Sequence, residues 1–125
     1  MKMNYIKSKT VLITGASAGI GEATAYKMAE YGANLVLTAR RTERMEKTSD
    51  EIKQKYGVNV TVKQLDVRDK AAVFALADDL KKGGLVPDIL VNNAGLSVGK
   101  DPIYSAEIDD WETMIDTNIK GFLYV

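Results

Sequence analysis

Short runs of consecutive apolar residues alternate along the chain with longer segments whose apolar positions recur every three or four residues. The short runs are typical of strands buried on both faces, and the longer segments are typical of amphipathic helices. The predicted strands are Thr10–Thr14, Asn34–Ala39, Val58–Leu65 and Asp88–Asn92. The predicted helices are Ile20–Tyr31, Arg41–Lys55, Asp69–Lys81 and Asp109–Val125.

Each predicted helix carries an apolar stripe that we expect to face the core. The inward residues are predicted to be Ile20, Ala23, Thr24, Met28 and Tyr31 in the first helix, Met45, Ile52 and Tyr56 in the second, Val73, Leu76, Ala77 and Leu80 in the third, and Trp111, Met114, Ile115, Ile119 and Phe122 in the fourth.

Strands that alternate with helices favour right-handed crossovers and a parallel sheet covered on both faces. We therefore expect an α/β fold of the Rossmann type, a doubly wound parallel sheet with strand order 3-2-1-4. A ligand crevice is expected where the order reverses, at the carboxyl ends of the first and fourth strands.

The last residues, Gly121–Val125, are apolar and fall inside the pattern of the fourth helix. The fourth strand would also form an uncovered apolar edge, which soluble proteins avoid. We therefore expect residues 1–125 to be a single domain, the N-terminal part of a longer chain whose catalytic half is absent.

Composition excludes several classes of protein. Lys+Arg and Asp+Glu both number 17, so the basic excess of a nucleic-acid or anionic-membrane partner is missing. Cysteine and histidine are absent, which excludes a Ser-His-Asp triad within these residues and leaves no expected metal site. No apolar run is long enough for a membrane span or signal peptide, so a cytoplasmic protein is expected.

A glycine-rich turn, Thr14–Gly21, joins the first strand to the first helix. Gly15 would permit a tight turn, Gly19 would let the backbone approach a pyrophosphate, and Gly21 would let the helix pack closely on the strand. The free N–H groups and the positive end of the helix dipole would face the phosphates. The turn therefore predicts a dinucleotide site.

Two other motifs could occur at the same turn. Gly15–Gly19 also fits G-x-S-x-G, the nucleophile elbow of α/β-hydrolases, with Ser17 as nucleophile. An elbow leaves Gly21 unexplained and would come too early in the chain, so the hydrolase remains a rival of lower rank. A P-loop is excluded because no Lys-Ser/Thr follows the glycines.

The second strand ends at Ala39, where an NAD site carries an Asp or Glu for the ribose 2′-hydroxyl. Arg40 and Arg41 follow instead. A guanidinium offers a 2′-phosphate a bidentate partner, so this end of the strand predicts NADP(H). Alternatively, both arginines are solvated residues at a helix start.

These segments, together with LDV at 65–67, NNAG at 92–95 and Asn118 in DTNIKG, resemble the N-terminal half of the short-chain dehydrogenase/reductase family. DILVNNAGLSVG and DWETMIDTNIKG are similar to segments of the NADP-dependent 3-hydroxy acid (serine) dehydrogenases. The resemblance implies a cofactor site composed of Gly15, Ser17, Ala18, Gly19, Ile20, Gly21, Arg40, Arg41, Asp66, Val67, Asn93, Ala94 and Gly95.

Within that set the resemblance implies separate tasks. Arg40 and Arg41 would hold the 2′-phosphate. Asp66 would accept a hydrogen bond from the adenine amino group, and Val67 would flank the ring. The residues of the NNAG motif would line the cofactor at the point where the strand order reverses. Alternatively, they only cap the end of the fourth strand.

Asn118 matches the family's catalytic asparagine. The resemblance implies that a local kink frees its backbone carbonyl to hold a water, which extends a proton relay to the catalytic lysine. The family's catalytic Ser and Tyr-x-x-x-Lys are missing from this half. Tyr5–Lys9 matches Tyr-x-x-x-Lys literally, but it precedes the first strand and is interpreted as a chance match.

The expected function is an NADP-dependent oxidoreductase that moves a hydride between nicotinamide and a small alcohol or carbonyl substrate, such as the 3-hydroxy acid serine. The 125-residue chain alone is expected to be inactive, and the longer protein is expected to form a homo-oligomer. The alternatives are a non-catalytic NADP-binding module and, more remotely, the hydrolase that uses Ser17.

Overall fold

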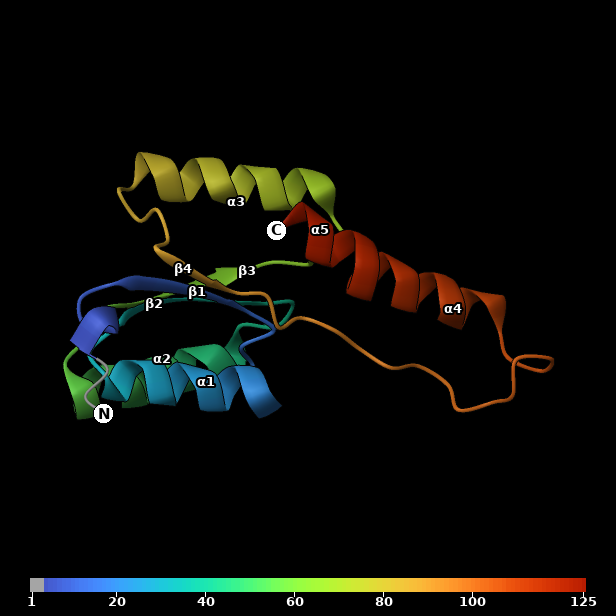
Figure 1. Ribbon diagram of the computed structural model, residues 1–125, viewed down its shortest axis with the longest axis horizontal. Helices are drawn as coiled ribbons and strands as arrows, with labels where there is room; N and C mark the ends of the chain where they lie inside the picture. The colour runs from blue at the N-terminus through green and yellow to red at the C-terminus, as the bar shows by residue number, and fades with distance from the viewer. Residues whose placement is uncertain (1–3) are drawn as a thin grey trace.

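The computed structural model describes residues 4–125, which form one parallel sheet with helices on both faces (Figure 1). The strands are β1 (Thr10–Thr14), β2 (Asn34–Ala39), β3 (Val60–Gln64) and β4 (Ile89–Val91). Their order is β3-β2-β1-β4, and all three neighbouring pairs are parallel. The predicted α/β class and strand order are therefore confirmed.

The helices α1 (Gly19–Glu30), α2 (Glu43–Tyr56) and α3 (Lys70–Lys82) lie where the sequence predicted them, with boundaries displaced by one or two residues. The other helical elements are the 3-10 turn η1 (Asn4–Ile6), α4 (Ile108–Ile115), the π-helix η2 (Asp116–Gly121) and α5 (Phe122–Tyr124). Figure 1 shows α1 and α2 on one face of the sheet and α3 with α5 on the other.

The core consists of two apolar layers, one on each face of the sheet. Val11, Ile13, Leu35 and Leu37 are buried toward α1 and α2, together with Met45 and Ile52 from α2. The alternate residues Leu12 and Val36 are buried toward α3 with Val73, Leu76 and Leu80. Because successive side chains of a strand point to opposite faces, a strand covered on both faces reads as a continuous apolar run.

The predicted stripe of the first helix is wrong at two positions. Ile20 is 78% exposed and Ala23 is also exposed, whereas α1 is buried through Gly21, Ala25 and Ala29. Small side chains let the helix lie close to the sheet, and a stripe of large residues would hold it away. In α3, Ala77 is exposed for the simpler reason that Val73, Leu76 and Leu80 already cover the sheet.

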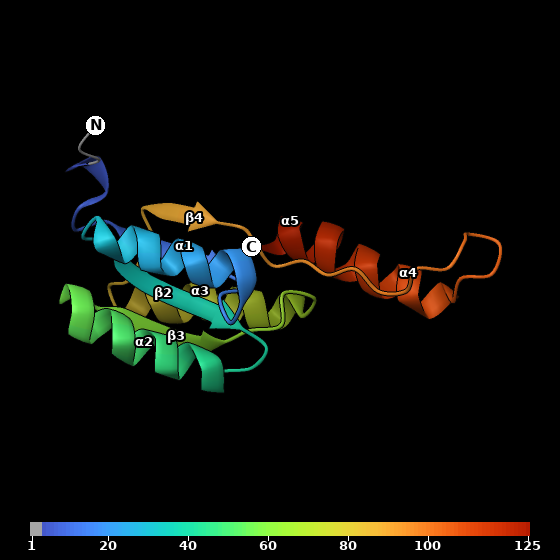
Figure 2. The ribbon, with the colours of Figure 1, turned by 90° about the horizontal axis from the view of Figure 1, so that it is seen from below.

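The fourth predicted helix is not one continuous element. It divides into α4, η2 and α5, and α4 points away from the sheet (Figure 2). Three members of its predicted inward stripe, Ile115, Ile119 and Phe122, are between 46% and 55% exposed. The sequence pattern correctly marks an apolar helix face, but the described part of the chain offers α4 no surface to cover it.

Strand β4 forms one edge of the sheet, and Leu90 on it is 45% exposed. Beside it lies an apolar groove of about 420 Å³ between β4 and α3, lined by Leu12, Leu76, Leu80 and Leu90 among others. No helix among the described residues is long and apolar enough to cross a membrane.

Candidate functional site

A cleft of about 550 Å³ opens at the carboxyl ends of the strands. Its walls come from the segments that follow β1, β2, β3 and β4 and from η2. Of the predicted cofactor residues, those that line it are Gly15, Ser17, Ala18, Ile20, Arg40, Arg41, Asp66, Val67, Asn93, Ala94 and Gly95. The topology thus brings together residues from four separate loops at the point where the strand order reverses.

The remaining two predicted residues, Gly19 and Gly21, shape the turn without lining the cleft. Gly19 has φ +59°, a conformation that favours glycine, and no atom lies within 4 Å of a Cβ placed there. At Gly21 a Cβ would lie 2.3 Å from the Gly15 oxygen and 2.7 Å from Asn93 Nδ2. Gly19 therefore leaves open space above the helix start, whereas Gly21 permits contact between α1 and the turn.

The amino end of α1 carries no side-chain cap, since Ala18 occupies the N-cap position. The first N–H groups of a helix have no partner within the helix, and the helix dipole places partial positive charge there. This end of α1 is thus suited to an anion, and its loop residues Ser17 and Ala18 line the cleft.

Thr14 and Asn93 join the glycine turn to the end of β4. The Thr14 hydroxyl accepts hydrogen bonds from the backbone N–H groups of Asn93, at 3.0 Å, and Ala94, at 2.9 Å. In return, Asn93 Nδ2 donates to the backbone oxygens of Thr14 and Gly15, at 3.1 and 3.2 Å. These four bonds fix two walls of the cleft relative to each other, so Asn93 has a structural task in addition to any contact with a ligand.

At the end of β2, Ala39 is buried, and Arg40 and Arg41 are exposed on the cleft wall. The backbone oxygen of Arg40 accepts a hydrogen bond from Gln64 Nε2, at 3.0 Å. These two arginines directly follow the end of β2, where no Asp or Glu is present. The arrangement provides positive charge where a ribose 2′-substituent is expected.

Asp66 lines the cleft next to these arginines and pairs with Arg68. The Arg68 side chain donates from Nη2 to Oδ2 at 2.7 Å and from Nε to Oδ1 at 3.0 Å. Hydrogen bonding from Arg68 lowers the pKa of the Asp66 carboxyl, and the charge of Arg40 acts in the same direction. Asp66 is therefore an anion held by one arginine and influenced by a second.

Asn118 lies within η2, the π-helical segment that interrupts α4 and α5. Its side chain spans the backbone of Leu96: Oδ1 accepts from the N–H at 2.8 Å, and Nδ2 donates to the carbonyl at 2.7 Å. The side chain thus fastens the helix to the loop after β4, beside Gly95. A π-helix alters the regular carbonyl pairing and is common at functional sites, which agrees with the kink that the resemblance implied.

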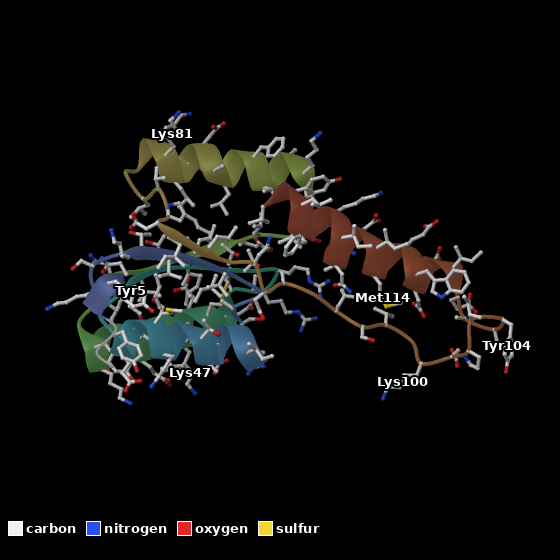
Figure 3. All side chains as sticks on the ribbon, viewed as in Figure 1. Tyr5, Lys47, Lys81, Lys100, Tyr104 and Met114 are labelled. Atoms are coloured by element: carbon white, nitrogen blue, oxygen red, sulfur yellow. The ribbon has the colours of Figure 1, made fainter. Side chains whose placement is uncertain are left out.

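No tyrosine is among the residues that line this cleft. Tyr5 precedes β1 and sits at the opposite end of the sheet, while Tyr104 lies at the tip of the projecting loop (Figure 3). Among residues 4–125, no group of three or more acidic, His or Cys side chains could hold a metal ion. The described cleft therefore carries three arginines on its wall and lacks both a metal-binding cluster and a tyrosine in its lining.

Sequence reasoning missed four residues of the cleft wall: Ala39, Leu65, Arg68 and Thr117. Ala39 and Leu65 could have been found because they end predicted strands, whereas Asp66 was assigned through the resemblance. Arg68 and Thr117 carry no such signal, since an arginine in a loop and a threonine in a helix are common in any sequence. Thr14 was assigned to β1, and its hydrogen bonds to the β4 loop follow only from the pairing of the strands.

Three comparisons with known proteins agree on one family. The model of the short chain dehydrogenase family matches residues 9–125. The NADP-dependent 3-hydroxy acid dehydrogenase YdfG of Salmonella typhi is 46% identical over 115 residues, which are 92% of this chain and 45% of that protein. The chain thus spans about half the length of the curated relatives it matches.

Two solved structures have the same fold. Serine dehydrogenase from Escherichia coli is 44% identical, with a TM-score of 0.82, over 92% of this chain and 51% of that one. L-Sorbose reductase from Gluconobacter frateurii, complexed with NADPH and L-sorbose, is 33% identical, with a TM-score of 0.90, over 99% of this chain and 46% of that one.

Proposed function

Since this chain belongs to the short chain dehydrogenase family, we propose that its cleft binds NADP(H) for hydride transfer to or from a small alcohol or carbonyl compound. A 3-hydroxy acid such as serine is the proposed substrate, because relatives named for that activity are among the most similar proteins. The observation that carries the proposal is the meeting of the glycine turn with Arg40 and Arg41 in one cleft.

The residues of the cleft fit the charge and shape of this cofactor. The open space above Gly19 and the uncapped start of α1 suit a pyrophosphate. Arg40 and Arg41 would bind the 2′-phosphate, and Asp66 with Val67 would bind the adenine. Asn93, Ala94 and Gly95 would flank the cofactor toward its nicotinamide end.

NADP(H) supplies the hydride donor or acceptor, and the protein supplies position and proton transfer. Among the described residues, Asn118 would act through its backbone carbonyl on a water of the proton relay. The Asn118 side chain hydrogen-bonds to the backbone of Leu96. These bonds would hold the backbone carbonyl of Asn118 in position. The acid/base step itself needs the family's Tyr-x-x-x-Lys pair, which no described residue of the cleft provides.

We expect the Arg40→Ala/Arg41→Ala chain to lose about ten- to a hundredfold in affinity for NADPH. The reason is that a charge-assisted hydrogen bond to phosphate contributes about 1.5–3 kcal/mol. NADH affinity should change little. Calorimetric titration of both cofactors measures the effect.

The Arg44→Ala/Lys47→Ala chain is the control, because it loses the same charge from exposed positions of α2 that do not line the cleft. An equal loss of NADPH affinity in that control would show that net charge alone governs binding. Unchanged NADPH affinity in the Arg40→Ala/Arg41→Ala chain would remove both residues from the phosphate site.

The 125-residue chain is expected to bind NADPH without oxidising 3-hydroxy acids. General acid–base assistance contributes about 10²–10⁴ in rate, and the cleft lacks the group that would provide it. The assay follows NADPH formation from NADP⁺ and a panel of 3-hydroxy acids, including serine. Turnover at enzyme-like rates would contradict this expectation and direct attention to Tyr104 and Lys120.

The function itself is tested by the same panel on a longer chain in which this sequence precedes a second half with Ser and Tyr-x-x-x-Lys. NADP⁺-dependent oxidation of at least one hydroxy acid supports the proposal. If that longer chain binds NADPH but oxidises no compound of the panel, a non-catalytic NADP-binding module becomes the better account.

A further inference from the structure

The ion pair between Asp66 and Arg68 lies on the cleft wall and engages both oxygens of the carboxylate. Oδ1 accepts from the backbone N–H and from Nε of Arg68, both at 3.0 Å. Oδ2 accepts from Nη2 at 2.7 Å and from Nε at 3.2 Å. A carboxylate has about four acceptor positions, so the three N–H donors of Arg68 occupy most of them and leave room for one further donor.

Asp66 also stands next to Arg40. Strands β2 and β3 are paired so that Ala39 lies opposite Gln64, and the N–H of Leu65 donates to the Ala39 oxygen at 2.9 Å. Arg40 and Asp66 follow these strand ends directly. Both line the main cleft, and both line a smaller hollow of about 320 Å³.

The position of Asp66 beside Arg40 is unfavourable for the binding of a phosphate. A carboxylate that is free to turn toward Arg40 would compete with the phosphate for that guanidinium and would repel the phosphate directly. Arg68 removes both effects, because it neutralises Asp66 and holds the carboxylate in a fixed orientation. It also adds a third guanidinium to the cleft wall, only 37% exposed at the side chain.

We propose that Arg68 is a specificity-determining residue of the cofactor site: by engaging Asp66, it leaves Arg40 free for the 2′-phosphate. The proposal rests on the NADP(H) function above and deepens it. Arg68 then favours NADP(H) over NAD(H) indirectly, while Asp66 keeps its place beside the adenine.

A structural role alone would give a different result. The Arg68 N–H bond to Asp66 closes the turn before α3, and Asp69 caps that helix by accepting from the Ala72 N–H at 3.0 Å. If Arg68 served only this turn, its replacement would lower thermal stability and weaken all ligands equally. The measurement must therefore compare two ligands that differ only in the 2′-phosphate.

The test is a calorimetric titration of the 125-residue chain with 2′,5′-ADP and with 5′-AMP, whose affinity ratio reports the 2′-phosphate contribution. We expect Arg68→Ala to lower this ratio by about tenfold. The Asp66→Asn/Arg68→Ala chain should recover most of the ratio, because the competing charge is gone. Arg44→Ala is the matched control, since Arg44 is an exposed arginine outside the cleft, paired with Glu22, and its ratio should equal the wild-type ratio.

Each outcome has a defined meaning. A wild-type chain without preference for 2′,5′-ADP overturns the NADP(H) function and the present proposal with it. A wild-type preference that Arg68→Ala leaves intact overturns the role of Arg68 alone, as does a double variant no better than Arg68→Ala. Circular dichroism verifies folding, and Arg68→Gln replaces Arg68→Ala with the same expected decrease if the alanine chain does not fold.

Discussion

Gly21→Ala is expected to destabilise the chain by about 3 kcal/mol or more, which corresponds to a decrease in Tm of roughly 10 °C. The added Cβ would lie 2.3 Å from the Gly15 oxygen and 2.7 Å from Asn93 Nδ2. The first of these is a backbone atom, and the second belongs to the network that joins the glycine turn to β4. A shift of the Gly15 carbonyl would disturb the turn that leads into α1, and a shift of the Asn93 side chain would break its bonds to the Thr14 and Gly15 oxygens. Thermal unfolding followed by circular dichroism measures the loss.

Gly83→Ala is the matched control for this substitution. Gly83 ends α3, has an ordinary φ of −80°, and a Cβ there would meet its nearest atom, the Asp79 oxygen, at 3.3 Å. The Tm of the Gly83→Ala chain should decrease far less than the Tm of the Gly21→Ala chain. Equal stability of the Gly21→Ala and wild-type chains would show that α1 does not need this close approach.

Gly19→Val is expected to fold and to lose detectable NADPH binding. No protein atom lies within 4 Å of a Cβ at Gly19, so the substitution clashes with nothing in the chain itself. Its cost to stability is the backbone strain at φ +59°, about 1–2 kcal/mol. The new side chain would, however, occupy the space proposed for the pyrophosphate. Circular dichroism and calorimetric titration separate the two effects.

Gly57→Val is the control, because it introduces the same backbone strain at a position away from the glycine turn. Gly57 has φ +68° after α2, also with no atom within 4 Å of a Cβ, and it lies outside both the cleft and the glycine turn that leads into α1. NADPH affinity should be unchanged in this control. Tight NADPH binding by a folded Gly19→Val chain would refute the phosphate-loop assignment.

Ser17→Ala tests the rival interpretation of the same turn. As a residue of a phosphate loop, Ser17 contributes one hydrogen bond, and its loss should weaken NADPH binding only modestly. As the nucleophile of a hydrolase elbow, it would be essential for cleavage of an activated ester. Esterase activity that disappears in the Ser17→Ala chain would support the hydrolase in place of the dinucleotide site.

The sheet could be predicted from the sequence because its signal is local. Runs such as Val11–Ile13 and Leu35–Leu37 can be buried on both faces only in a covered parallel sheet. The glycine turn could likewise be assigned, since its three glycines have distinct steric tasks at fixed spacing. In each case the signal lies in a short segment of the sequence.

Features that depend on distant segments were harder to predict. Ile20 belongs to the apolar pattern of α1, yet it is exposed because the helix start borders the cleft. The stripe of α4 is apolar, but whether it is buried depends on a surface that the described residues do not provide. Thr14 joins the site through its bonds to the β4 loop, 79 residues away in the sequence. The pairing of Arg68 with Asp66 is local, but it concerns the cleft only because the folded chain places both residues on its wall.

The most direct test of the central claim, that this cleft is an NADP(H) site, is a calorimetric titration of the wild-type chain with NADPH and with NADH under identical salt conditions. The cleft carries Arg40 and Arg41 at the end of β2, where a site for NAD(H) carries a carboxylate. We predict that NADPH binds about ten- to a hundredfold more tightly than NADH. Equal affinities, or tighter binding of NADH, would contradict the account.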